Sequence, residues 1–173
     1  MPWSTGERED YDLSTNTHER IGMGTGVNQM QDNDVGLSVA PPEPGDTEAI
    51  TDVARDYIEG WLDGNEERMR RCLHPDLVKR TIYHGPERGD WELGRPANAE
   101  MMVGWTRDGE GQTAVARERA FEITVQDVFR HIASVKVLSH PYMDYLHVAK
   151  IGDRWLIVNV LWELREGEMQ PPS

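Results

Sequence analysis

The chain has 173 residues, 38% of them hydrophobic, and a formal net charge of −13 at pH 7. This length suits one domain with a core of its own. The excess of acidic residues argues against nucleic acid as a partner, because a negatively charged surface repels phosphate backbones. No apolar run reaches membrane-spanning length and the N-terminus lacks a signal-peptide pattern, so a cytoplasmic protein without membrane contact is predicted. The single Cys72 fits a reducing compartment.

Residues 1–46 form a compositionally distinct segment, rich in Gly, Asn, Asp, Ser and Thr and poor in large apolar residues. Such a segment buries too little surface to offset its ordering entropy. We therefore predict a flexible acidic N-terminal tail over 1–46, one domain over 47–166 and a short C-terminal tail over 167–173.

Three helices are expected in the first half of the domain. An apolar stripe at three- and four-residue steps, including Ile50, Tyr57 and Trp61, predicts a helix that begins at Asp46 or Thr47 and ends at Gly64. A second helix is expected over 66–73 and is stopped by the following proline. A third begins near residue 96 and ends near residue 109.

Strand-like runs make up the rest of the domain. Two of them, at 77–84 and 91–93, precede the third helix. Four more follow as a meander, at 119–129, 132–139, 142–151 and 154–164. Because most helices come first along the chain and an antiparallel sheet comes last, we predict an α+β domain with the helices on one face of the sheet.

Strand alternation predicts which side chains face the helices. If Lys150 points to solvent, Tyr145 and His147 face inward, and continuity across the next turn places Trp155 and Asn159 inward as well. An apolar outer row then remains on the last strand and predicts a homodimer contact. This row comprises Val158, Val160 and Trp162. The alternative is a β-bulge that reverses the parity.

Several segments together resemble a known superfamily. They are DYIEGWLDGN at 56–65, LHPDLVKR at 73–80, MVGWTR at 102–107, ASVKV at 133–137 and the run from 144 to 162. Over 47–163 the chain resembles the nuclear transport factor 2-like superfamily, in the branch labelled SnoaL-like or "putative lumazine-binding", which is related to steroid delta-isomerases. The resemblance implies a cone of three helices on a strongly curved antiparallel sheet, an internal pocket and dimerisation through the outer sheet face.

Members of that superfamily include isomerases, cyclases, dehydratases and pure binding modules, so fold does not select a function. Tyr57 resembles the first-helix tyrosine with which steroid isomerases polarise a carbonyl. Where those enzymes place an aspartate base, this chain has Tyr83 and His84. The candidate catalytic residues are therefore Tyr57, His84 and, as first choice for acid/base chemistry, His147. The alternatives are a core aromatic for Tyr57 and a hydrogen-bonded pocket-lining group for His147.

Six further residues are candidates for contact with the substrate: Trp61, Arg80, Trp105, Tyr145, Trp155 and Asn159. Arg80 would supply an anion-binding guanidinium if it faces inward, and would otherwise pair with an acid on the surface. The tryptophans would line a pocket for a flat ligand or belong to the core. No metal or cofactor is expected. The predicted function is a cofactor-independent isomerase, dehydratase or cyclase acting on a small carbonyl compound, and the alternative is a non-catalytic ligand-binding or dimerisation module.

Overall fold

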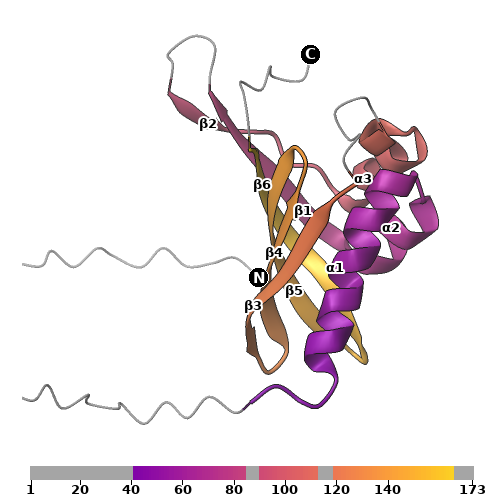
Figure 1. The fold of residues 1–173 in the computed structure, drawn as a ribbon, viewed down its shortest axis with the longest axis vertical. Coiled ribbons are helices and arrows are strands. Elements are labelled where there is room, and N and C mark those ends of the chain that lie inside the picture. Colours follow the sequence, from indigo (N-terminus) through magenta and orange to yellow (C-terminus); the bar gives the residue numbers. More distant parts are fainter. Residues whose placement is uncertain (1–40, 85–89, 113–118, 166–173) are drawn as a thin grey trace, which may run out of the picture. The chain divides into compact units, whose positions relative to one another are not determined.

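A computed structural model describes residues 41–84, 90–112 and 119–165 of the chain. Most of the predicted N-terminal tail and all of the predicted C-terminal tail lie outside these residues. In the described part, helices pack on one face of a curved six-stranded sheet (Figure 1). The predicted α+β class is confirmed. No helix of the described residues combines the length and apolar character needed to cross a membrane.

The helices form where the apolar stripes predict them. Their bounds are Asp46–Asp63 for α1, Glu66–Cys72 for α2 and Ala99–Arg107 for α3, followed by a short 3-10 helix, η1, at Glu110–Gln112. Asn65 and Asn98 cap α2 and α3 by accepting hydrogen bonds from backbone N–H groups. Gly64 ends α1 in the left-handed conformation, at φ 67°, which favours glycine.

The sheet has the order β2-β1-β6-β5-β4-β3. Its strands are Leu73–His84 (β1), Trp91–Leu93 (β2), Phe121–Phe129 (β3), Ile132–Ser139 (β4), Tyr142–Ile151 (β5) and Arg154–Leu164 (β6). All pairs are antiparallel except β1 with β6, which is parallel. The sheet is therefore mixed, a correction to the antiparallel sheet expected above. Strand β1 also begins earlier than expected, because Leu73 already pairs with Ile157 before a register shift.

The core lies between the helices and the concave face of the sheet. Ile50, Ala54 and Ile58 of α1 are fully or almost fully buried, as are Val135 of β4 and Leu146 of β5. Burial of apolar surface of this kind is the main favourable term in folding. The core consequently fixes which face of each strand is internal.

On β5 the predicted parity is wrong. Tyr145 is 46% exposed and His147 is exposed, whereas Asp144 is buried with 2% exposure. The prediction failed because Lys150, assumed to face solvent, lies on the inner face. It forms an ion pair with the buried Asp46, at 3.0 Å. A lysine with a buried carboxylate partner does not mark the solvent side of a strand.

On β6 a bulge changes the parity partway along the strand. His147 pairs with Asn159 and Val148 with Ile157, so Val158 is the extra residue. Trp155 therefore faces inward as predicted, with 5% exposure. Beyond the bulge the prediction is wrong, since Asn159 lies on the outer face beside His147.

The same bulge corrects the predicted dimer contact. Val160 is only 1% exposed, and Trp162 lies under the ammonium group of Lys79, inside the cone. Neither residue can belong to an outer row. Leu161 takes that place and is 44% exposed.

Candidate functional site

Polar side chains collect at one level of the cone, close to the turn between β4 and β5. Pairing aligns one transverse row of inward side chains: Ile123, Val137, Asp144, Trp162 and Thr81. The next row toward the turn holds Phe121, Ser139, Tyr142 and Leu164. On the side of the Asp144 row that is farther from the turn, the next row is apolar on β3 to β6 and ends with a lysine on β1. Its residues are Val125, Val135, Leu146, Val160 and Lys79. Inside the cone, the row farther from the β4–β5 turn is therefore mostly apolar, and the two rows nearer the turn contain most of the polar side chains.

At this level Tyr57, Lys79 and Asp144 form a compact group, which we name the inner cluster. The Tyr57 hydroxyl donates a hydrogen bond to Oδ1 of Asp144, at 2.9 Å. Lys79 Nζ donates to the same oxygen, at 3.0 Å, and also to the Tyr57 hydroxyl oxygen. The three residues come from α1, β1 and β5, so only the folded domain brings them together.

Aromatic rings surround the ammonium group of the inner cluster. Lys79 Nζ lies 5.1 Å from the centroid of the Tyr57 ring and 5.2 Å from that of Trp162. Tyr142 packs edge-on against Trp162, with centroids 5.4 Å apart. Such cation–π contacts stabilise a partly desolvated ammonium. The same rings offer flat walls to a ligand.

Burial raises the pKa of the Tyr57 hydroxyl well above its ordinary value of 10.0, and the negative charge of Asp144 raises it further. Burial likewise raises the pKa of Tyr142, with additional contributions from Asp144 and Glu110. Both hydroxyls therefore remain protonated hydrogen-bond donors at neutral pH. The buried carboxylate of Asp144 is balanced by one ammonium, as a buried charge requires.

This arrangement is suited to chemistry at a carbonyl group. An ammonium has three N–H donors, and two of those of Lys79 are engaged by Tyr57 and Asp144. The third can bind a carbonyl or enolate oxygen. Both donors to Asp144 bind Oδ1, so no described residue donates to Oδ2. That oxygen can accept a proton.

Of the predicted catalytic residues, only Tyr57 lies in the inner cluster. It is buried, with 3% exposure, as expected for a first-helix residue that faces inward. His147 lies on the outer face, where its Nδ1 is 3.3 Å from the amide nitrogen of Asn159. His84 ends β1, and its side chain lies outside what the structure describes. The role assigned to His147 inside the cone is thus incompatible with its position.

The predicted substrate contacts are scattered. Trp61 is half-buried against the core, and Trp105 on α3 is 37% exposed. Arg80 pairs with Leu161 and shares its outer face. Trp155 is buried, but it lies seven residues from Trp162 along β6, which is about 23 Å in an extended strand. Tyr145 and Asn159 face outward, as described above.

Three residues of the site were missed: Lys79, Asp144 and Trp162. A signal existed in the sequence, because Lys79 and Asp144 each interrupt an apolar run within a strand. A charged residue in such a run is either a solvent-facing residue or half of a buried pair. The predicted parity of β5 placed Asp144 on the solvent side and the orientation of Lys79 was left open, whereas the structure joins the two as a buried pair.

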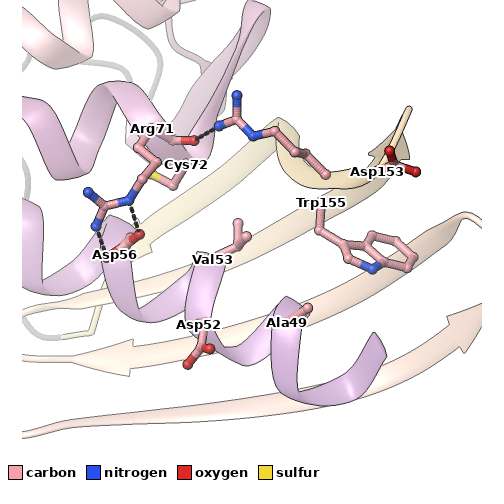
Figure 2. A pocket seen from close by; sticks show the side chains of 9 residues that line it. Ala49, Asp52, Val53, Asp56, Arg71, Cys72, Asp153 and Trp155 are labelled. Carbon is pink, nitrogen blue, oxygen red and sulfur yellow. Dashed lines mark hydrogen bonds and ion pairs between the residues drawn. The ribbon is translucent and has the colours of Figure 1, made fainter. Parts of the chain in front are cut away.

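A separate surface groove lies between α1, the end of α2 and the start of β6 (Figure 2). It has a volume of about 280 Å³ and is lined by Ala49, Asp52, Val53, Asp56, Arg71, Cys72, Asp153, Arg154 and Trp155. Two of its charges pair with each other, since Arg71 donates two hydrogen bonds to Asp56, at 2.7 and 2.8 Å. Burial raises the pKa of the Cys72 thiol, which disfavours the nucleophilic thiolate. The inner cluster is therefore the better candidate site.

Comparison with known families gives a match over most of the described chain. The model of the family described as "Putative lumazine-binding" matches residues 45–163, most of the chain. No curated protein matches the chain.

Solved structures with the same fold include two bacterial proteins described as nuclear transport factor 2-like and of unknown function. The protein from Silicibacter pomeroyi is 17% identical, with 69% of this chain and 95% of that chain covered and a TM-score of 0.52. The protein from Methylobacillus flagellatus is 19% identical, with 75% and 98% covered and a TM-score of 0.54. At these identities the likeness supports the fold alone.

Proposed function

The chain belongs to the "Putative lumazine-binding" family of nuclear transport factor 2-like proteins, and from this premise we propose that it binds a small carbonyl compound at the inner cluster and moves a proton on it. Small-molecule binding is the part of this function that the family description supports. The observation that carries the finer proposal is the convergence of Tyr57 and Lys79 on Oδ1 of Asp144 inside the cone.

The proposed reaction is proton transfer next to a carbonyl. Oδ2 of Asp144 takes a proton from the carbon beside the carbonyl, and the electron pair of that C–H bond forms the double bond of an enolate. Lys79 binds the enolate oxygen as it becomes negative. Return of the proton to a different carbon completes an isomerisation. If a hydroxyl group on the β-carbon leaves instead, it takes up the proton held by Asp144 and departs as water, which completes a dehydration.

Tyr57 has a different role here from the carbonyl polariser predicted above. Its hydroxyl group donates a hydrogen bond to Asp144, and its oxygen accepts a hydrogen bond from Lys79. It therefore acts as a positioning residue that holds the base and the ammonium in register. In this proposal Asp144 is the acidic base, which the sequence does not provide at the position where steroid isomerases have it.

The test is hydrogen exchange on a flat ketone. We would incubate the protein with 2-tetralone in D₂O and follow loss of the α-proton signals by NMR. A general base typically contributes about 10²- to 10⁴-fold to rate. Asp144→Asn, which keeps the shape of the side chain but not its basicity, should lower protein-dependent exchange by at least about 100-fold.

The matched control is Asp46→Asn, because Asp46 is also a buried aspartate paired with a lysine, but it lies at the other end of the core. This variant should retain exchange. If Asp144→Asn exchanged at the wild-type rate, Asp144 would not be the base.

A pure binding module is the second candidate, and the burial of the cluster favours it. Tyr57 and Asp144 are 3% and 2% exposed, so a ligand must displace side chains to reach them. Lumazine, named by the family description, is a suitable fluorescent probe. Binding of lumazine that is weakened in the double variant Lys79→Met/Asp144→Asn, without exchange on any ketone, would select this candidate.

We further propose that two copies pair through the outer sheet face. Val78, Tyr145 and Leu161 are 39%, 46% and 44% exposed there, on three neighbouring strands. An apolar patch shared by adjoining strands is typical of a protein interface. In sedimentation velocity at micromolar concentration, Leu161→Glu should be monomeric and the wild type dimeric. Met101→Glu, at a residue 42% exposed on α3, is the control that should remain dimeric.

A further inference from the structure

One buried hydroxyl of the described residues lacks any hydrogen-bond partner. Ser139 is 3% exposed, and its Oγ receives and donates no hydrogen bond within the described part of the chain. The other buried hydroxyls behave differently. Thr81 donates to the carbonyl of Ile82, at 3.2 Å, and Thr106 to that of Met102, at 2.8 Å. Since buried polar groups are almost always paired, the exception requires a cause.

Ser139 belongs to the same internal surface as the inner cluster. It follows Val137 by two positions on β4, and Val137 pairs directly with Asp144. Two residues of an extended strand span about 6.6–6.8 Å. The hydroxyl therefore lies in the row next to Asp144, on the side of the β4–β5 turn.

Aromatic rings lie at both of these levels. Tyr142, in the same row as Ser139, packs edge-on against Trp162, which lies in the row of Asp144. Planar walls favour a planar ligand. The two rows are about 6.6–6.8 Å apart along the strands, which is close to the length of a six-membered ring with one substituent.

We propose that Ser139 binds the second polar group of a two-ended, planar ligand whose carbonyl end is held by Lys79. This inference rests on the proposed function and names its substrate class: an aromatic or conjugated carbonyl compound with a hydroxyl or second carbonyl at the far end. The ligand completes the hydrogen bonding of Ser139, as substrates do where a site is built to recognise a polar group. Ser139 determines specificity and takes no part in proton transfer.

The test uses two ketones that differ only at the far end, 4-hydroxyacetophenone and 4-methylacetophenone, with affinities measured by calorimetry. The wild type should prefer the hydroxyl compound by about 3- to 10-fold, the range of one neutral hydrogen bond. Ser139→Ala should bind both ketones equally. The control is Ser134→Ala on the same strand, because Ser134 pairs with His147 on the outer face and should leave the preference unchanged.

Thermal stability provides an independent readout. Removal of an unpaired buried hydroxyl should leave Tm unchanged or raise it. A clear decrease in the Tm of Ser139→Ala would show that the hydroxyl is already satisfied within the protein, and would overturn the inference. Equal affinity of the wild type for the two ketones would overturn it as well.

Failure of the proposed function has a different signature. If the double variant Lys79→Met/Asp144→Asn bound both ketones as tightly as the wild type, the carbonyl site would be wrong. A preference for the hydroxyl compound that Ser139→Ala abolished would in that case still support the contact at Ser139.

Discussion

Two groups of the same chemical kind lie at opposite ends of the cone interior. The inner cluster joins Asp144 to Lys79 and Tyr57. The second group, which we name the end cluster, joins Asp46 to Lys150 and Trp155. In both, a buried aspartate binds a lysine and an aromatic donor, and the lysine lies over an aromatic ring.

The two clusters differ in which carboxylate oxygens are occupied. Asp46 Oδ1 accepts from Lys150 and from Trp155 Nε1, each at 3.0 Å, and Oδ2 accepts from the backbone N–H of Glu43. Asp144 receives both of its hydrogen bonds on Oδ1. The end cluster is a closed structural tie between the start of α1 and the sheet. The inner cluster keeps one carboxylate oxygen available for a proton, which distinguishes a candidate site from a structural contact.

The largest effect is expected for Lys79→Met. This change leaves the carboxylate of Asp144 buried without a counter-charge, which typically costs about 3–5 kcal/mol in unfolding free energy. Chemical denaturation measures the loss. The double variant Lys79→Met/Asp144→Asn removes both charges and should recover much of the stability; if it is as unstable as the single variant, the pair does not act as a charge pair.

Tyr57→Phe should cost about 1.5–3 kcal/mol at neutral pH, because Asp144 loses one of its two hydrogen bonds and the acceptor is charged. The variant also has a pH signature. Folding raises the pKa of Tyr57, so its stabilising contribution is complete below the ordinary value of 10.0 and is lost as the pH rises above it. Above pH 10 the stability difference between wild type and variant should shrink. A constant difference up to pH 11 would contradict burial of the hydroxyl.

Trp155→Phe should have a smaller effect on Tm, which is present at neutral pH and diminishes at acid pH. The hydrogen bond from Trp155 is the main cause of the lowered pKa of Asp46, followed by that from Lys150. A lowered pKa contributes stability above the ordinary value of 3.8 that is lost as the pH falls through the folded value. The Tm difference between wild type and variant should therefore be largest at neutral pH and shrink as the pH falls below the ordinary value of 3.8, with ketone binding retained. Loss of ketone binding would mean that the end cluster is part of the site.

His147→Ala is expected to have the smallest effect. The side chain is exposed on the outer face, so stability should change by less than about 0.5 kcal/mol. Hydrogen exchange on 2-tetralone should be unchanged, since the imidazole lies on the opposite side of the sheet from Asp144. A large loss of exchange would mean that the parity of β5 described here is wrong.

Most of the fold could be predicted from the sequence. The apolar stripe located α1, and the alternating runs located the last four strands to within a few residues, because local periodicity reflects which face is buried. The parallel pairing of β1 with β6 could not be predicted in this way. It depends on how β1 enters the sheet after two helices, which no local pattern records.

The candidate site was predicted only in part, for a reason that concerns lysine. Tyr57 lies on an eighteen-residue helix, where the apolar stripe defines the inward face without ambiguity. The assignments for β5 and β6 depended on one assumption, that Lys150 faces water. Its pairing with Asp46, more than a hundred positions earlier in the chain, invalidated that assumption and exchanged His147 for Asp144 on the inner face.

The sequence by itself determined the class of fold and the inward position of Tyr57, because both follow from periodicity over many residues, and the resemblance of several segments indicated the family. Only the tertiary structure decided which polar side chains meet inside the cone. Asp144 and Lys79 are 65 positions apart, and a one-residue bulge at Val158 determines that Trp162 lies beside them. Long-range pairing of charges and a local change of strand parity leave no periodic trace in a sequence, so the inner cluster becomes visible only when the sheet is assembled.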